Sequence, residues 1–158
     1  VSEAVELVVP GARVELKWPN DLLLRGAKLG GILMESRGEY GGQWQLVIGI
    51  GLNLDQPASE GRTSLAAEGL PLPTTEEITV ALLTQMLPRL SAVAEDPGPW
   101  LDAWRDRDYY RGAEVRVYGP DHSWEGRVAG IEPDGALCLD TATGMKRVTG
   151  GDVSLRGA

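Results

Sequence analysis

The chain has 158 residues, enough for one ordinary domain or two small ones, and 42% of them are apolar, which permits a packed core. The net charge of −8 and the scattered basic residues argue against nucleic acid as a partner, because phosphate binding needs a basic face. One cysteine, Cys138, excludes an intrachain disulfide and a zinc site built from cysteines. No apolar run approaches the roughly 18 residues of a membrane helix, and no signal-peptide pattern is present, so we expect a protein of the reducing cytoplasm that does not bind membranes.

Three strand-like runs occupy the first third of the chain. Residues 14–18 alternate between apolar and polar and end at Pro19, and residues 28–36 form a second run around two adjacent glycines. Residues 45–54 are almost continuously apolar, which predicts a central strand covered on both faces. Because the spacers between these runs are short and rich in turn residues, the neighbours are expected to be antiparallel.

Two helices are predicted in the middle of the chain. After a loop over residues 56–73, Thr74 and Glu77 have the spacing of a capping box. Pro88 lies inside the following helical pattern and removes one backbone hydrogen bond, which predicts a kink. Residues 96–99 (Asp-Pro-Gly-Pro) end this helix, and a shorter one follows. The expected apolar faces comprise Ile78, Leu82, Met86, Leu90 and Val93 in the first helix and Trp100, Leu101 and Trp104 in the second.

After Arg111 the pattern changes to short strands separated by turns, with Cys138 expected as a small buried residue in one of them. Five strands in so few residues favour a small β-barrel. The sequence therefore predicts an α+β fold in two domains: residues 1–110, with helices on a mixed or antiparallel sheet, and residues 111–158, a five-stranded β-barrel. The five strands are expected at residues 114–118, 124–131, 136–139, 145–149 and 153–155.

The run 28–33 (Lys-Leu-Gly-Gly-Ile-Leu) carries the clearest chemical signal. Two adjacent glycines weaken a strand, but they let a ligand or another backbone approach closely. Lys28 is expected on the same face as Gly30, which places a cation beside bare backbone and suits a carboxylate or a phosphate. A bulged strand with a solvent-exposed lysine is the alternative that these residues leave open.

Two further runs are less specific. Residues 17–21 (Lys-Trp-Pro-Asn-Asp) place two short polar side chains where a strand ends, and by themselves they predict only a turn. Residues 49–54 (Gly-Ile-Gly-Leu-Asn-Leu) are not a dinucleotide-binding fingerprint, because the third glycine is missing and no helix begins there. Asn53, a polar residue at the end of this apolar strand, needs a protein or ligand partner.

Together, in this order and spacing, the runs 17–21, 28–33 and 47–53 resemble the second half of the catalytic domain of biotin protein ligases. Residues 63–65 (Thr-Ser-Leu) fit the family's usual run, and 150–156 are similar to its small C-terminal domain. The resemblance departs mildly at Gly30, where many members have alanine. The family's glycine- and arginine-rich loop, which lies upstream of the tryptophan-bearing strand, is not among these 158 residues.

The resemblance implies a partial catalytic core like that of class II aminoacyl-tRNA synthetases. It implies an ATP-dependent ligase that forms biotinyl-5′-AMP and transfers biotin to a lysine of a biotin carboxyl carrier protein, a subunit of acetyl-CoA carboxylase. The implied substrates and cofactors are biotin, ATP and Mg²⁺, and a homodimer is an assembly that the family suggests.

The biotin side of the implied site is carried by the second run. Lys28 corresponds to the family's essential lysine, which touches the biotin carboxylate and the α-phosphate of ATP, and it is the predicted catalytic residue. Gly30, Gly31 and Ile32 are expected to line the biotin pocket.

The nucleotide side of the implied site comes from the other two runs. Asn20, Asp21 and Asn53 are expected there, with Lys17 assisting in neutralising phosphate charge. Asp21 is also the predicted neighbour of magnesium.

Two other functions stay open at this point. One is a truncated, inactive relative that acts as a binding or interaction protein, and the other is a lipoate-type acyl ligase, although lipoate ligases usually lack the C-terminal barrel and the Trp-Pro-Asn-Asp run. The only histidine, His122, is expected in an exposed turn, so a Ser-His-Asp hydrolase and a histidine-based metal site are set aside. Without the arginine-rich loop, the 158 residues alone are expected to activate biotin weakly or not at all.

Overall fold

The computed structural model describes residues 1–40, 43–96, 98–119, 123–149 and 154–157. These residues form two antiparallel sheets and three helices. In chain order the elements are α1 (Ser2–Val8), β1 (Val14–Lys17), β2 (Asp21–Leu24), β3 (Ala27–Tyr40), β4 (Gln43–Leu52), α2 (Thr75–Glu95), α3 (Gly98–Arg105), β5 (Glu114–Tyr118), β6 (Ser123–Ile131), β7 (Leu137–Thr141), β8 (Gly144–Val148) and β9 (Ser154–Gly157).

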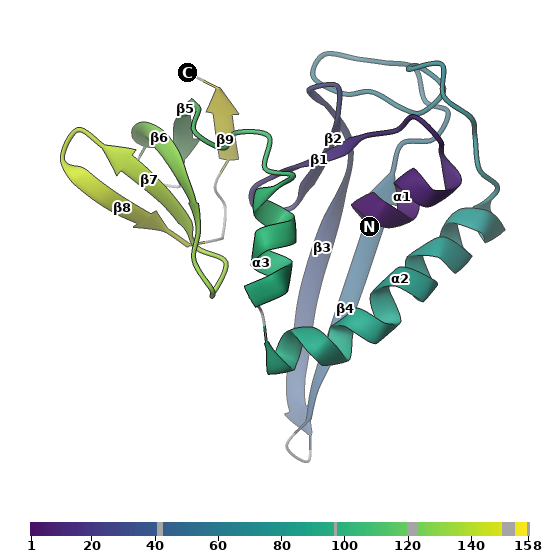
Figure 1. Cartoon of the computed structure of the whole chain (residues 1–158), viewed down its shortest axis with the longest axis horizontal. Coiled ribbons are helices and arrows are strands. Elements are labelled where there is room, and N and C mark those ends of the chain that lie inside the picture. Colours follow the sequence, from purple (N-terminus) through teal and green to yellow (C-terminus); the bar gives the residue numbers. More distant parts are fainter. Residues whose placement is uncertain (41–42, 97, 120–122, 150–153, 158) are drawn as a thin grey trace.

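The first sheet has the strand order β1-β2-β3-β4, and each pair of neighbours is antiparallel, as predicted. Helices α1 and α2 lie against one face of this sheet (Figure 1). The apolar side chains between the helices and the sheet form one core, because each helix buries only the stripe that faces the strands. This core includes Val5, Val14, Leu22, Leu24, Leu29, Leu65 and Ile78.

Strand β2 is an element that the sequence analysis does not assign. Leu24 pairs with Ala27 across a two-residue turn in which Arg25 and Gly26 have φ values of 50° and 81°. Two positive φ values are typical of a type I′ turn, whose twist matches that of a hairpin. Arg-Gly lacks the Asn-Gly or Asp-Gly signature of this turn, so three leucines alone did not indicate a strand. The short helix α1 is likewise not predicted.

Strand β4 is an edge strand of the described sheet, so the prediction of a central strand covered on both faces is wrong. Among the described residues β4 pairs with β3 alone. Leu46 and Val47, which are adjacent and therefore point to opposite faces, are 53% and 47% exposed. A continuous apolar run shows that the side chains are hydrophobic, but it does not show how many other strands pair with this one.

Helix α2 begins with the predicted capping box. The Glu77 backbone N–H donates to Thr74 Oγ1 at 3.2 Å, and the Thr74 N–H donates to Glu77 Oε2 at 2.8 Å. The helix continues through Pro88, and the kink expected there stays a prediction. Its predicted apolar face is buried at Ile78, whereas Leu90 is 40% exposed, because the core extends along this helix only as far as Leu82. None of the helices in the described residues is long and apolar enough to cross a membrane.

The second sheet has the strand order β8-β7-β6-β5-β9. Its five strands confirm the predicted elements to within a few residues at each end. Alternate side chains face a separate core, which includes Val115, Val117, Val128, Leu137 and Leu139. No pairing between β8 and β9 occurs among the described residues, so closure of the five strands into a barrel stays a prediction.

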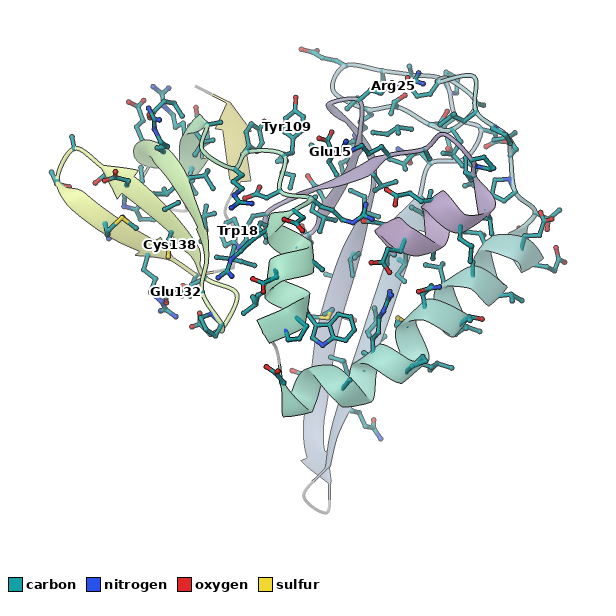
Figure 2. The ribbon with its side chains drawn as sticks, in the orientation of Figure 1. Glu15, Trp18, Arg25, Tyr109, Glu132 and Cys138 are labelled. Carbon is teal, nitrogen blue, oxygen red and sulfur yellow. The ribbon has the colours of Figure 1, made fainter. Side chains whose placement is uncertain are left out.

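Cys138 lies in β7, as predicted, but it is only half-buried. Leu137 and Leu139 point into the core, so the pleat directs the side chain between them to the opposite face. There Cys138 Sγ lies 3.6 Å from Oε1 of Glu132, which is in the turn between β6 and β7; both residues are labelled in Figure 2. Burial, followed by the hydrogen bond to the Glu132 carboxylate, raises the pKa of the thiol. His122 lies outside the described residues.

The two sheets are connected through β1 and the segment after α3. The backbone N–H of Leu16 donates to the carbonyl of Arg107 at 2.7 Å, and the N–H of Tyr109 donates to the carbonyl of Leu16 at 2.9 Å. Arg107 also forms a two-point ion pair with Glu6 of α1, with N–O distances of 2.6 and 2.8 Å. The outer edge of β1 is therefore covered by this segment. Whether the two domains divide near Tyr110 stays a prediction.

Candidate functional site

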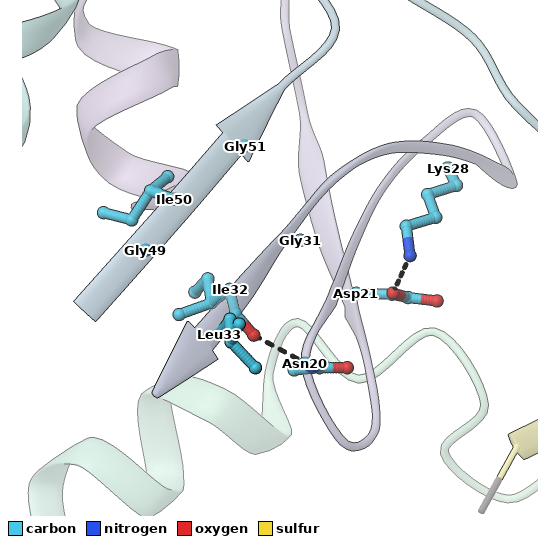
Figure 3. Close-up of a pocket in the computed structure, with 9 residues that line it drawn as sticks. All are labelled: Asn20, Asp21, Lys28, Gly31, Ile32, Leu33, Gly49, Ile50 and Gly51. Carbon is cyan, nitrogen blue, oxygen red and sulfur yellow. Dashed lines mark hydrogen bonds and ion pairs between the residues drawn. The ribbon is translucent and has the colours of Figure 1, made fainter. Parts of the chain in front are cut away.

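A cavity of about 410 Å³ opens on the first sheet, where the β1–β2 turn meets β3 and β4 (Figure 3). It is wide enough for a small organic molecule, and it combines one ammonium group and one carboxylate with bare backbone. The residues that line it are Asn20, Asp21, Lys28, Gly31, Ile32, Leu33, Gly49, Ile50 and Gly51.

Glycines form the floor of this cavity. Gly31 lies directly opposite Gly51 in the β3–β4 register, and Leu33 lies opposite Gly49, so the three glycines share one face of the sheet. A methyl group added to Gly51 would meet no heavy atom within 4 Å, and one added to Gly49 would meet only Leu33, 3.7 Å away. The missing side chains therefore leave open space above the strands that a ligand can occupy.

The charged group at the cavity is a triad of two lysines and one aspartate. The Lys28 ammonium contacts Oδ1 of Asp21, and the Lys17 ammonium lies 3.3 Å from Oδ2. The side chain of Lys28 is 38% exposed, compared with 14% for Lys17 and 17% for Asp21. Two positive groups and one negative group leave one net positive charge, and Lys28 is the member best placed to present it to an anion in the cavity.

Lys28 shares a face with Gly31 and not with Gly30, which corrects the sequence-based expectation. The register against β2 shifts between Leu22, opposite Gly30, and Leu23, opposite Lys28, so Leu29 is an extra residue on β3. Such a bulge interrupts the alternation of side chains. A Cβ atom on Gly31 would lie 3.7 Å from Lys28 Cε.

Gly30 is not among the residues that line the cavity. It is buried, and a Cβ atom added to it would overlap the carbonyl oxygen of Gly51 and approach Leu52 to 3.0 Å. Its lack of a side chain therefore permits close packing of β3 on β4. The two adjacent glycines serve different purposes because they lie on opposite faces of β3, and the bulge places Gly31 on the face of Lys28.

Asn20 fastens the β1–β2 turn to β3. Its side-chain Nδ2 donates to the carbonyl of Ile32 at 2.8 Å (Figure 3). Its own backbone carbonyl accepts from the Ile32 N–H at 2.9 Å. These two bonds hold the turn against the rim of the cavity, with Asp21 next in the chain. The structure therefore brings five of the predicted site residues together around the cavity: Asn20, Asp21, Lys28, Gly31 and Ile32.

Asn53 contacts the backbone of this site but does not line the cavity. Its Nδ2 donates to the carbonyl of Thr63 at 2.9 Å and to the carbonyl of Lys28 at 3.3 Å. The partner that this polar residue needs is therefore the protein itself, because its amide group donates to two backbone carbonyls. The Lys28 carbonyl also accepts from the Thr63 N–H at 3.0 Å, so the base of the lysine is held from two sides.

Asp21 was predicted to be a neighbour of magnesium. Both of its carboxylate oxygens face ammonium groups, and the described residues contain no cluster of three or more His, Cys, Asp or Glu side chains that could hold a metal ion. Magnesium keeps several waters and usually takes one or two carboxylates together with phosphate oxygens. The residues present therefore do not form a magnesium site by themselves.

Four residues of the cavity are absent from the predicted site. The runs that carry the family resemblance contain Gly49, Ile50, Gly51 and Leu33, but the sequence analysis assigns none of these four to the site. The signal in the sequence was that two neighbouring antiparallel strands both contain glycines, a Gly-Gly pair in one and a Gly-X-Gly run in the other. These glycines form the floor of a cavity only if the register places them opposite one another. Sequence spacing alone does not give that register.

Comparisons with known proteins match both parts of the chain. A model of the Biotin/lipoate A/B protein ligase family matches residues 5–53, which contain the cavity. A model of the biotin protein ligase C terminal domain matches residues 112–156, which contain the second sheet. The two matches place the chain in the class of biotin and lipoate protein ligases.

Individual relatives narrow this class to one family. The Bifunctional ligase/repressor BirA of Escherichia coli K12 is 33% identical over 154 residues, which cover 92% of this chain and 47% of the relative. The biotin--[acetyl-CoA-carboxylase] ligase of Mycobacterium tuberculosis is 36% identical over 157 residues, covering 96% and 57%. The structure of the biotin protein ligase of Aquifex aeolicus in complex with biotin and ATP matches with a TM-score of 0.82 at 25% identity, covering 99% of this chain and 67% of that chain. The chain belongs to the biotin protein ligase family, and it spans about half the length of the curated relatives it matches.

Proposed function

We propose that this protein serves in ATP-dependent biotin protein ligation and that its cavity binds the reacting end of biotin. The observation that carries the proposal is the Lys28 ammonium beside a cavity floored by Gly31, Gly49 and Gly51. A cation next to bare backbone suits a carboxylate attached to a compact organic body. The relatives support the choice of ligand, since one is a biotin--[acetyl-CoA-carboxylase] ligase and another was solved with biotin and ATP.

The proposed reaction has two steps. An oxygen of the biotin carboxylate attacks the α-phosphorus of ATP, and the bond to the β-phosphate oxygen breaks, which gives biotinyl-5′-AMP and pyrophosphate. The amine of a carrier lysine then attacks the acyl carbon and releases AMP, and the amine loses a proton. The first step brings two anions together, so neutralising charge and aligning the reactants are its main physical requirements.

Lys28 is assigned the neutralising role in this first step. Its ammonium is the more exposed of the two positive groups, and its backbone is held by Asn53 and Thr63, so the charge is preorganised. It acts by electrostatic stabilisation and is neither base nor nucleophile. Gly31 and Ile32 are proposed to contact biotin, and Gly30 contributes by letting β3 and β4 pack closely.

The nucleotide is proposed to lie on the turn side of the cavity. Asn20 and Asp21 are at its rim, and Lys17 adds positive charge from behind Asp21. The side-chain amide of Asn53 donates to two backbone carbonyls, one of which is that of Lys28, so Asn53 supports the backbone of the site. Its position next to the nucleotide remains a prediction. Asp21 remains a predicted neighbour of a magnesium ion brought by the nucleotide.

The wider setting follows from the family and is part of the same proposal. The acceptor is a lysine of a biotin carboxyl carrier protein, which the name of the mycobacterial relative supports. The class II synthetase-like core, a cytoplasmic location and a homodimer are proposed with it. No role in binding nucleic acid is assigned to these residues, since the net charge is −8.

The test of the proposal is the substitution Lys28→Ala. We expect biotin-dependent exchange of labelled pyrophosphate into ATP to fall about a hundredfold, since loss of one preorganised donor raises a barrier by about 3 kcal/mol. Lys146→Ala, the same change on β8 of the second sheet, is the matched control and should leave exchange unchanged. If the 158 residues alone exchange too slowly to follow, the same variants are compared by their affinity for biotinyl-5′-AMP. Equal behaviour of the Lys28 variant and the unmodified protein would refute the assignment.

A lipoate ligase is the second candidate, because the family model that matches residues 5–53 covers both substrates. Titration calorimetry with biotin and with lipoate separates the two, and we expect heat of binding from biotin only. An inactive binding protein is the third. It would bind biotin but, when supplied with ATP and a carrier protein, would form no biotinylated lysine detectable by mass spectrometry.

A further inference from the structure

Trp18 lies in the segment of the first sheet that forms the site, but its side chain belongs to the core of the second sheet. The residue is 4% exposed and packs in the cluster that contains Val115, Val117 and Leu139. Its indole Nε1–H donates to the carbonyl of Gly135 at 3.0 Å. Figure 2 shows the side chain at the border between the two sheets. The ring is therefore fixed by a core that is separate from the one beneath the cavity.

The residues that follow Trp18 directly are those at the rim of the cavity. Only Pro19 separates Trp18 from Asn20, whose side chain and carbonyl bond to Ile32, and Asp21 follows with its contact to Lys28. Because only one residue lies between them and the peptide units are planar and stiff, a displacement of the Trp18 backbone is expected to move Asn20 as well. The position of the turn is thus set from two ends, by β3 on one side and by the second sheet on the other.

The acceptor of the indole bond lies in a defined turn. The Gly135 N–H donates to the carbonyl of Glu132 at 2.8 Å, and Gly135 has a φ of 84°, a conformation that favours glycine. The turn lies between β6 and β7, two strands that bury Ile131 and Leu137. The carbonyl that holds Trp18 is therefore positioned by strands of the second sheet.

We propose that Trp18 is a positioning residue through which the second sheet, at the Glu132–Gly135 turn, sets the place of Asn20 and Asp21 beside Lys28. Trp18 does not line the cavity and touches no reacting atom in this arrangement. The consequence for ligand binding rests on the proposed function, whereas the coupling itself does not.

The coupling is tested by NMR of the protein labelled with ¹⁵N-asparagine. The chain contains only two asparagines, Asn20 and Asn53, so the spectrum has two side-chain amide groups, and Asn53 serves as an internal reference. In Trp18→Phe, which keeps an aromatic ring but removes the N–H donor, we expect the Asn20 amide signals to shift and to exchange with water faster. The Asn53 signals should stay in place, because the Thr63 carbonyl bonds that side chain without help from the turn.

A second variant alters the acceptor of the same hydrogen bond, the carbonyl of Gly135. Gly135→Ala adds a methyl group that meets no atom within 4 Å, but it strains the positive φ from which the carbonyl is presented. We expect the Asn20 signals to shift in the same direction as in Trp18→Phe. Trp100→Phe, the same change in α3, where the ring lies against Arg89, is the control and should leave both asparagines unchanged. An unshifted Asn20 in both test variants would overturn the proposal.

A binding measurement separates this proposal from the proposed function. In Trp18→Phe we expect the affinity for biotinyl-5′-AMP to fall about tenfold, because misplacing a contacting group weakens binding without removing the charge of Lys28. If the unmodified protein does not bind the adenylate, the proposed function fails, while the asparagine spectrum still decides the coupling. If the unmodified protein binds it and Trp18→Phe binds it equally, the positioning role fails.

Discussion

The two sheets of this protein use their side chains differently. In the first sheet, β3 and β4 extend past the core as a hairpin on which Leu33 and Met34 are 60% and 64% exposed, and three glycines leave its cavity bare. In the second sheet, β5 alternates strictly between exposed and buried positions, and Val117 and Leu139 are fully buried. A site for a ligand needs open surface and backbone access, whereas a small sheet is stable only if nearly every inward side chain packs.

This difference has a consequence for how the site is supported. The first sheet cannot pack the space above its glycines without filling the cavity, so part of the rigidity of the site must come from elsewhere. Trp18 and the Glu6–Arg107 ion pair supply contacts from outside the cavity. A sheet that leaves a cavity open therefore depends on contacts from neighbouring elements to hold the residues of the cavity in place.

The largest expected difference between the two sheets is in the free energy of unfolding after loss of an apolar side chain. Leu139→Ala removes a fully buried side chain and should reduce the free energy of unfolding by about 3 kcal/mol. Met34→Ala, on the 64% exposed hairpin, should change it by less than about 0.5 kcal/mol. Urea unfolding followed by circular dichroism gives both values, and equal costs would break the comparison.

A smaller difference is expected for the same glycine substitution in both sheets. A Cβ atom on Gly126 of β6 would lie 2.6 Å from the carbonyl oxygen of Asp140, so Gly126→Ala should cost about 2 kcal/mol of stability. Gly51→Ala meets no atom within 4 Å, so its stability should stay within about 0.5 kcal/mol of the unmodified protein. Its methyl group projects into the cavity, however, and should weaken biotin binding in calorimetry. A Gly51 variant that loses stability but keeps its affinity would contradict this assignment of the cavity.

The smallest of these effects concerns the contact between α1 and the segment after α3. Burial alone raises the pKa of Glu6, but hydrogen bonds from Arg107 and Val14 outweigh it and hold that pKa below its ordinary value of 4.5. The stabilisation is therefore complete above this value and is lost as the pH falls through the lower pKa of the folded state. Glu6→Gln should cost about 1.5 kcal/mol at neutral pH. The difference between the two proteins should vanish in acid, and a difference that persists there would show that the charge of Glu6 is not its source.

The sequence predicted correctly those features that depend on residues close together in the chain. The capping box at Thr74 and Glu77 is a contact between residues three apart, so it could be read directly and is confirmed. The five short strands of the second sheet follow from alternation and turn residues, which act over a few positions. The family could be named because three short runs occur in a fixed order.

The sequence was less informative where contacts join distant residues. The bulge at Leu29, which turns Lys28 toward Gly31, arises from pairing with β2, a strand that the sequence did not reveal. The exposure of β4 depends on how many strands lie beside it. The roles of Gly49 and Gly51 follow from a register that no spacing rule supplies.

The amino-acid sequence by itself determined the α+β class of the fold and the family, and it predicted a role for Lys28, because these rest on residue types and short spacings. Tertiary structure alone decided which glycines line the cavity, which side chains surround the lysine and that Trp18 belongs to the second core. The physical reason is that pairing register and packing between sheets are set by contacts between residues far apart in the chain, whose energies no local pattern encodes.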